Sequence, residues 1–157
     1  MNRDRAESCV FQQFAGDLIA GGFEFCFQAK GRSMLPTIQD GEILHIQPVI
    51  TGKLRIGHIV LLRRGEQFRA HRIIRRRGEF FVTRGDAGLQ HDGFIPRGHI
   101  LGLVIGKRCT ITGRMVRLDT PGARLRFFAD EARRRVAMLV GVSPSERMEE
   151  PRPESNL

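Results

Sequence analysis

Apolar residues along this chain recur first at a helical spacing and then at a strand spacing. Over residues 5–19 they recur every three or four positions, which is typical of an amphipathic helix, and the Gly21-Gly22 pair predicts its end. Over residues 23–29 three phenylalanines alternate with other residues, which predicts a strand. Similar patterns predict strands over residues 43–48, 58–63, 67–76, 79–84 and 100–112. Residues 85–98 are rich in Gly, Asp and Pro and are expected to form a loop.

The pattern changes after residue 113. Over residues 123–140 apolar residues recur on one face and arginines lie elsewhere, so we expect a basic amphipathic helix. Residues 143–157 contain three prolines and many charges, which predicts a disordered tail. The expected fold is mainly β: an N-terminal helix (1–22), a compact antiparallel β domain (23–113), a C-terminal helical extension (114–142) and the tail (143–157).

Composition constrains the partners and the compartment of the protein more than its activity. Against 17 acidic residues, 26 Lys and Arg give a net charge of +9, which suggests an anionic neighbour such as nucleic acid, acidic lipid or acidic protein. Three cysteines without C-x-x-C spacing argue against a disulfide framework or a zinc site and favour a reducing compartment. The longest uncharged stretches have 10 residues, whereas a bilayer span needs roughly 20 apolar ones. We therefore expect a cytoplasmic protein that is at most peripheral to a membrane.

One irregular stretch, residues 31–42, points to chemistry. Ser33 lies between Gly31 and a Met-Leu pair, Pro36 fixes its own φ and removes a backbone donor, and Asp40-Gly41 predicts a turn. A hydroxyl held in such a backbone, beside exposed amide groups, has what a nucleophile needs. The structural alternative is a corner in which Ser33 only caps a neighbouring amide.

A serine nucleophile needs a base, and His71 is the candidate. It lies between apolar positions of the predicted strand 67–76, and an imidazole accepts a proton near neutral pH. Asp86 and Asp92, in the glycine-rich region that follows, offer a carboxylate to hold the imidazole tautomer. The structural alternatives are a histidine that satisfies a carbonyl at a sheet edge and aspartates that form Asx turns.

Several ordered motifs resemble those of the signal peptidase I and LexA-type peptidase clan (S24/S26-type). Residues 31–42 are similar to its serine box, x-S-M-x-P-T followed by a D-G-E turn, and residues 57–61 resemble its G-D-I-V strand with His58 in place of the Asp. Residues 70–74 resemble the H-R-[VI] strand of the archaeal and endoplasmic-reticulum-type signal peptidases, in which histidine replaces the lysine base. Residues 83–87 with Asp92 resemble the T-K-G-D-x loop, and residues 100–107 the closing I-x-G-x-V strand. The match covers residues 24–108.

The resemblance implies a serine endopeptidase that works through an acyl-enzyme, without cofactor or metal. Ser33 would be the nucleophile, with its own backbone N–H serving the oxyanion, and His71 the general base. Asp86 and Asp92 are both candidates to orient His71, and the choice stays open.

The same resemblance implies an extended peptide substrate, such as a precursor or leader peptide. Met34, Leu35 and Pro36 are the expected substrate-binding residues, in a shallow pocket for small side chains. The chain departs from the clan in showing no membrane anchor and too short an N-terminal segment for the helix-turn-helix of LexA. The basic helix would rest on anionic lipid or pack on the β domain with solvated arginines, and an anchoring protein is a further possible partner.

Two other functions remain open. A LexA-like regulator would cleave its own chain, and the Ala15-Gly16 bond has the required residues, although it lies in a predicted helix and the lysine base is absent. A non-enzymatic binder would use the arginines, but the chain has no zinc motif and no RNP-like strand, so nucleic acid is not expected as a partner.

Overall fold

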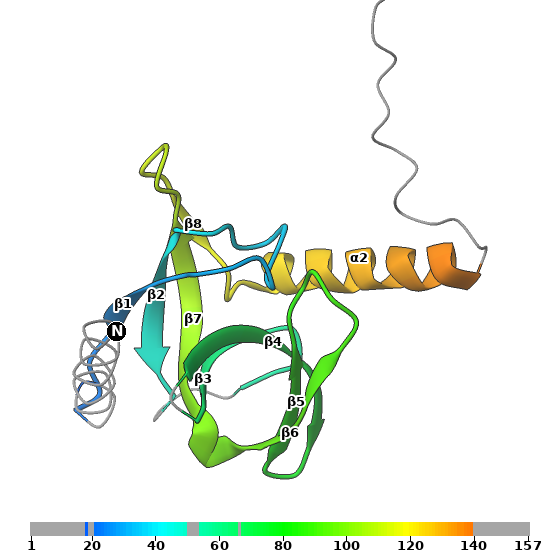
Figure 1. The fold of residues 1–157 in the computed structure, drawn as a ribbon, viewed down its shortest axis with the longest axis horizontal. Helices are drawn as coiled ribbons and strands as arrows, with labels where there is room; N and C mark the ends of the chain where they lie inside the picture. The colour runs from blue at the N-terminus through cyan, green and yellow to red at the C-terminus, as the bar shows by residue number, and fades with distance from the viewer. Residues whose placement is uncertain (1–17, 19–20, 50–53, 66, 140–157) are drawn as a thin grey trace, which may run out of the picture.

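A computed structural model describes residue 18 and residues 21–49, 54–65 and 67–139 of the chain. Its described part is mainly β, with eight strands in a single sheet and one long helix after them (Figure 1). The strands are β1 (Phe25–Gln28), β2 (Ile43–Pro48), β3 (Ile59–Arg64), β4 (Gln67–Arg77), β5 (Phe80–Arg84), β6 (His91–Pro96), β7 (Ile100–Arg108) and β8 (Met115–Arg117). The short helix η1 (Arg97–His99) precedes β7, and α2 (Pro121–Leu139) closes the described chain.

All strand pairings are antiparallel, in the order β1-β2-β7-β3-β4-β5-β6, with β8 paired to β7. Register shifts interrupt four of these pairings, and such bulges bend a sheet and increase its twist. The sheet consequently curls, so that Phe27 of β1 and Phe68 of β4 meet edge to face with ring centroids 6.3 Å apart. The expected mainly β antiparallel fold is confirmed.

The core lies on both faces of β3. Its residues alternate between two buried clusters: Ile59 and Leu61 belong to one, and Val60 and Leu62 to the other. Successive side chains of a strand point to opposite faces, so a strand buried on both sides reads as an unbroken apolar run. The curled sheet thus builds two hydrophobic clusters from one continuous set of strands.

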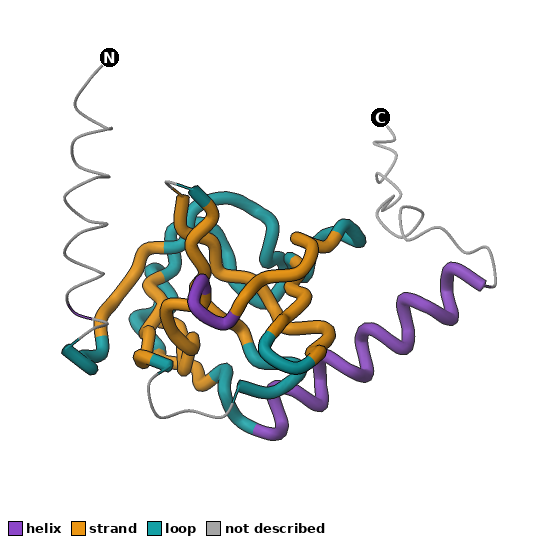
Figure 2. The backbone as a smooth tube through the Cα atoms, turned by 90° about the horizontal axis from the view of Figure 1, so that it is seen from below, coloured by secondary structure: helices purple, strands orange, loops and turns teal. Residues whose placement is uncertain are grey.

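Helix α2 lies along the sheet, and its C-terminal part projects beyond the strands (Figures 1 and 2). The Thr120 hydroxyl accepts the Ala123 N–H at 3.2 Å, and Pro121 occupies the first helical position, so the start of the helix is capped. The face toward the sheet is partly polar: Phe127 packs there, and Glu131 pairs with a sheet arginine. The predicted apolar stripe faces outward, and its large exposed members are Leu125, Phe128, Val136 and Leu139.

Four sequence expectations meet a clear outcome. The strands predicted over residues 43–48, 67–76 and 79–84 are confirmed by β2, β4 and β5. The loop predicted over residues 85–98 is wrong, because main-chain pairing with β5 makes most of it strand β6, whose Gly93 adopts a φ of +85°. The strand predicted over residues 100–112 ends at Arg108, and β8 was not predicted. The C-terminal helix is confirmed, with bounds shifted to Pro121–Leu139.

The predicted N-terminal helix (1–22) falls almost wholly outside the described residues, as does the tail (143–157). Within the part of the chain that the structure describes, no helix combines the length and the apolar character that crossing a bilayer requires.

Candidate active site

Ser33 and His71 lie within hydrogen-bond distance of each other. The Ser33 Oγ is 3.1 Å from the His71 Nε2, although 38 residues separate the two along the chain. Ser33 sits in the irregular segment between β1 and β2 and is exposed, whereas His71 projects from the middle of β4 and is buried. The pair therefore combines a fixed imidazole with an accessible hydroxyl.

Asp92 lies on the other side of the imidazole. Its Oδ2 is 2.6 Å from the His71 Nδ1 and also accepts the Thr83 hydroxyl at 2.7 Å. A carboxylate only accepts hydrogen bonds, so Nδ1 carries the proton and the Nε2 lone pair faces Ser33. Burial alone would raise the pKa of Asp92, but the hydrogen bonds from His71 and Thr83 outweigh burial and hold that pKa below its usual value. Asp92 therefore stays ionised beside His71.

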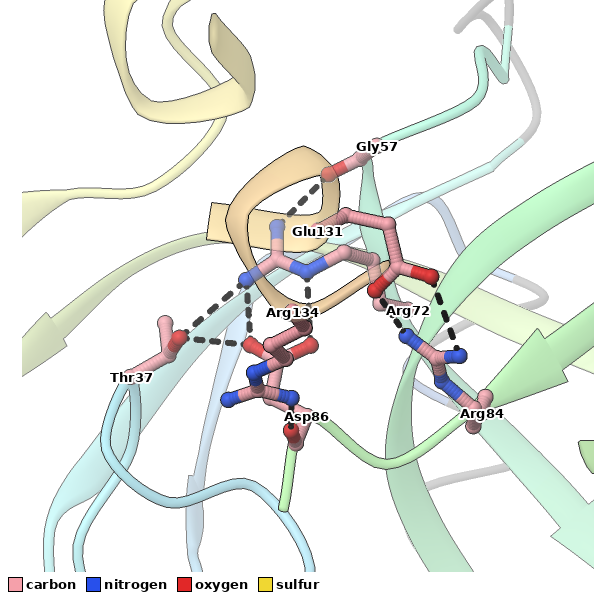
Figure 3. Close-up of polar contacts among 7 residues, drawn as sticks. All are labelled: Thr37, Gly57, Arg72, Arg84, Asp86, Glu131 and Arg134. Atoms are coloured by element: carbon pink, nitrogen blue, oxygen red, sulfur yellow. Dashed lines mark hydrogen bonds and ion pairs between the residues drawn. The ribbon is translucent and has the colours of Figure 1, made fainter. Parts of the chain in front are cut away.

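Asp86 is placed elsewhere. Its two carboxylate oxygens accept the Arg72 Nε at 2.8 Å and the Arg72 Nη2 at 2.6 Å, and Oδ2 also accepts the Thr37 hydroxyl at 2.5 Å (Figure 3). Arg72 is 3% exposed and donates in addition to the Gly57 carbonyl at 2.7 Å. The two aspartates that the sequence left as alternatives thus have different partners: Asp92 contacts His71, and Asp86 binds Arg72.

The segment that carries Ser33 is held by a set of short polar contacts. The Gly31 N–H donates to the Asp40 carboxylate at 2.7 Å, which closes the segment on itself. At its far end, buried Glu42 accepts the Lys107 ammonium from β7 at 2.8 and 2.9 Å. Charge-assisted hydrogen bonds of this length are stronger than neutral ones, so the segment that carries Ser33 is tied to the sheet.

The three residues expected to bind substrate occupy different environments. Met34 is 5% exposed and packs in the hydrophobic cluster that contains Ile59 and Leu61. Leu35 is half-buried. Pro36 is exposed and lines a cavity of about 260 Å³ beneath α2, next to Asp86.

Helix α2 adds a second polar network behind the site. Glu131 accepts two hydrogen bonds from Arg84 of β5, the shorter at 2.6 Å, and Arg134 donates to the Asp86 carbonyl oxygen (Figure 3). The hydrogen bond from Arg84 lowers the pKa of Glu131 more than burial raises it. Arg84 pairs with Arg72 in the β4–β5 register and so lies on the same side of the sheet, whereas His71, next to Arg72 on β4, points to the other side.

His58 occupies the position where the resembled motif carries an aspartate. Its Nδ1 accepts the Arg55 N–H at 3.2 Å, and its Nε2 is 3.5 Å from the Arg124 Nη1 of α2. Burial, followed by the charges of Arg124 and Arg55, lowers the pKa of His58 below 6.5. His58 therefore acts as a neutral acceptor between β3 and α2. Among the described residues no His, Cys, Asp and Glu side chains gather in a group suited to a metal ion.

Sequence reasoning missed the roles of Arg72 and Thr83. A signal was present for both: Arg72 precedes the apolar pair Ile73-Ile74 and Thr83 follows the apolar run 80–82, and a charge or hydroxyl buried beside such residues needs a partner. Strand alternation places Arg72 opposite in direction to His71, so its partner had to come from the other side of the sheet. Arg134 and Glu131 carried no comparable signal, since the sequence does not say which face of a helix meets the sheet.

The sequence model of the Peptidase S24-like family matches residues 8–105. The chain therefore belongs to the Peptidase S24-like family. Membership is consistent with a serine peptidase that takes a protein substrate. A search among curated proteins found no match to the chain.

Proposed function

We propose that this protein is a serine endopeptidase in which Ser33 is the nucleophile, His71 the general base and Asp92 the residue that orients His71. The observation that carries the proposal is the 3.1 Å separation between the Ser33 Oγ and the His71 Nε2. Membership in the Peptidase S24-like family supports it independently. The base would be a histidine, as in the archaeal and endoplasmic-reticulum-type branch that residues 70–74 resemble.

The proposed reaction runs through an ester on Ser33. Its Oγ attacks the peptide carbonyl carbon while His71 takes the hydroxyl proton at Nε2, and the backbone N–H of Ser33 donates to the oxyanion. When the C–N bond breaks, His71 gives that proton to the leaving amine. A water molecule then attacks the ester, His71 takes its proton, and the proton returns to the Ser33 oxygen as the carboxylic acid leaves. Asp92 stabilises the imidazolium in both halves.

An extended peptide fits the environment of Ser33. The nucleophile is exposed on an open stretch of surface, so a segment of chain reaches it without entering a deep cavity. Half-buried Leu35 is the neighbour best placed to contact a small side chain beside the cleaved bond. We propose processing of a precursor or leader peptide as the physiological reaction, with specificity for small residues at that position.

A fluorophosphonate probe tests the nucleophile without knowledge of the substrate. The Ser33 oxygen attacks phosphorus, fluoride leaves, and His71 takes the proton, so intact-mass spectrometry detects one stable adduct. We expect labelling of the wild type at Ser33, none in Ser33→Ala, and a rate at least 100-fold lower in His71→Ala. His99→Ala, at an exposed histidine of η1, is the matched control and should label normally. Equal labelling of wild type and Ser33→Ala contradicts the proposal.

The self-cleaving alternative is tested on the same samples. The Ala15-Gly16 bond lies outside the described residues, and a regulator of that kind would convert its own chain to a shorter product in a Ser33-dependent manner. We expect the wild-type mass to stay intact over days at pH 7.5, because the proposed substrate is another polypeptide. Cleavage at Ala15-Gly16 would favour the regulator instead.

We further propose that the outward stripe of α2 contacts an anionic membrane surface. Leu125 and Val136 are exposed there, Arg126 is exposed on the same helix, and the side chain of Arg135 is 76% exposed. Apolar side chains with flanking arginines suit the headgroup region of acidic bilayers. Co-sedimentation should show binding to vesicles of phosphatidylglycerol and phosphatidylcholine, lost in Val136→Glu. Equal recovery with pure phosphatidylcholine vesicles, or none with either, contradicts it; in the latter case an anchoring protein is the remaining partner.

A further inference from the structure

Helix α2 contacts the three-residue segment 84–86 at both of its ends. Glu131 binds the Arg84 guanidinium through both carboxylate oxygens, at 3.3 and 2.6 Å, and Arg134 donates to the backbone carbonyl of Asp86 (Figure 3). Glu131 and Arg134 are three positions apart, so they lie on the same face of the helix, and both are half-buried. The helix thus fixes where this segment leaves strand β5.

This segment and the residue that follows it, Ala87, both contact the backbone of Ser33. The Ala87 N–H donates to the Ser33 carbonyl at 3.0 Å. Gly85 approaches that carbonyl so closely that a β-carbon at position 85 would stand 2.4 Å from its oxygen. Contacts at positions 85 and 87 therefore hold the nucleophile residue from both sides of Asp86, and a shift of the segment moves Ser33 with it.

Arg72 joins the nucleophile segment to the same unit at a second point. Its guanidinium binds the Asp86 carboxylate and also lies 3.3 Å from the hydroxyl of Thr37, four residues after Ser33. The Phe127 ring of α2 covers that guanidinium at 4.6 Å from the ring centroid, which favours the charge in a site shielded from water. The helix therefore supports both attachment points of the nucleophile segment.

We infer that Arg134 and Glu131 of α2 are positioning residues for the Ser33–His71 pair. The inference rests on the proposed function and adds a part of the chain to it that lies outside the matched family region, residues 8–105. Neither side chain contacts a reacting atom. They set the 3.1 Å separation between Oγ and Nε2 through residues 84–87. A displacement of about 1 Å at a reacting group lowers a rate by up to about 100-fold. Loss of either contact from α2 should therefore change the labelling rate measurably.

The fluorophosphonate probe, applied to the full chain, tests the inference. Arg134→Ala should lower the maximal labelling rate about tenfold and leave the half-saturating probe concentration unchanged, because the probe contacts Ser33 and not α2. Glu131→Gln should act in the same direction, about fivefold. Arg134→Lys retains a donor and should recover at least half of the lost rate. Arg134→Met preserves the length of the stem and replaces the alanine variant if that one fails to fold.

Arg133→Ala is the matched control, since among the described residues its exposed side chain pairs with Asp130 alone, at 3.7 Å and three positions away. It should label at the wild-type rate. A helix that merely stabilises the fold would reduce the fraction of protein that labels, whereas a positioning role reduces the rate at which the folded fraction labels. A labelled wild type with an Arg134→Ala rate within twofold of it overturns this inference alone. An unlabelled wild type overturns the proposed function as well.

Discussion

Changing Asp86 or Asp92 to asparagine should affect stability and labelling rate differently. Asn has the shape of Asp without its charge, so the substitutions probe charge and hydrogen bonding rather than volume. Asp92 contacts His71 at 2.6 Å, and Asp86 binds Arg72 at 2.6 and 2.8 Å. Asp92 thus hydrogen-bonds to the proposed base, and Asp86 is the counter-ion of a buried cation.

For Asp92→Asn we expect a large loss of rate and a small loss of stability. The amide presents an N–H donor to Nδ1, which favours the tautomer with the proton on Nε2, so His71 no longer accepts the proton of Ser33. The fluorophosphonate labelling rate should fall about 1000-fold, or about 4 kcal/mol in activation free energy. An amide nitrogen in place of Oδ2 no longer accepts the Thr83 hydroxyl, so the folded state loses that hydrogen bond and the free energy of unfolding should fall by about 1 kcal/mol.

For Asp86→Asn we expect a large loss of stability and a small loss of rate. Arg72 is 3% exposed, so loss of its counter-ion leaves a charge in a site where water does not compensate it. Breaking such a buried pair costs about 3–5 kcal/mol, against a total stability of about 5–15 kcal/mol for a domain. The melting temperature should fall by about 6–20 °C. The folded fraction should still label within about tenfold of the wild type, because His71 and Asp92 stay in place.

Both effects are measured on the same preparations. The chain has no Trp or Tyr, so unfolding in urea is followed by far-ultraviolet circular dichroism rather than by intrinsic fluorescence. Labelling rates come from intact mass at several probe concentrations. A labelling rate of Asp92→Asn within threefold of the wild type would refute the role of Asp92. An Asp86→Asn variant as stable as the wild type would refute the view that Arg72 depends on it.

Three further changes test other contacts. Burial and the neighbouring Arg124 lower the pKa of His58 below 6.5, so the unfolded chain takes up this proton before the folded chain does as the pH falls. The free energy of unfolding should therefore be fully developed above about pH 6.5 and decline toward pH 5. In His58→Asn, urea unfolding should show a flatter dependence of that free energy on pH. Gly85→Ala places a β-carbon 2.4 Å from the Ser33 carbonyl and should slow labelling about 100-fold; a rate within threefold of the wild type contradicts the close approach. Glu42→Gln removes the counter-ion of the Lys107 ammonium, which lies 2.8 Å away, and should lower the free energy of unfolding by about 3 kcal/mol. A loss of less than about 1 kcal/mol contradicts this.

Strand patterns were the part of the fold that the sequence predicted best. The apolar run at residues 59–62 and the alternation in β1 follow directly from a side-chain period of two. Strand β6 escaped prediction because its Gly93 and Pro96 are turn residues by local preference. Its strand conformation comes from pairing with β5, a long-range contact that composition does not encode.

The sequence named the residues of the candidate site but did not say which of them pair. Ser33, His71 and Asp92 were each named from local sequence, yet the preference for Asp92 over Asp86 beside His71 depends on where β6 returns along β5. The sequence left open whether the basic helix rests on lipid or packs on the β domain. In the structure the sheet presents Arg72 and Arg84 to α2, and these cations select the polar face that carries Glu131.

Strand β4 carries two contacts of the candidate site on adjacent residues, so its length is critical. His71 points to one side of the sheet and Arg72 to the other, so a single inserted or deleted residue between β3 and position 71 would exchange the two sides. A guanidinium would then stand beside the Ser33 hydroxyl, where it has no capacity to accept a proton, and an imidazole would replace the cation under the helix. Natural variation in chain length is therefore expected to fall outside this strand, in the turns at either end.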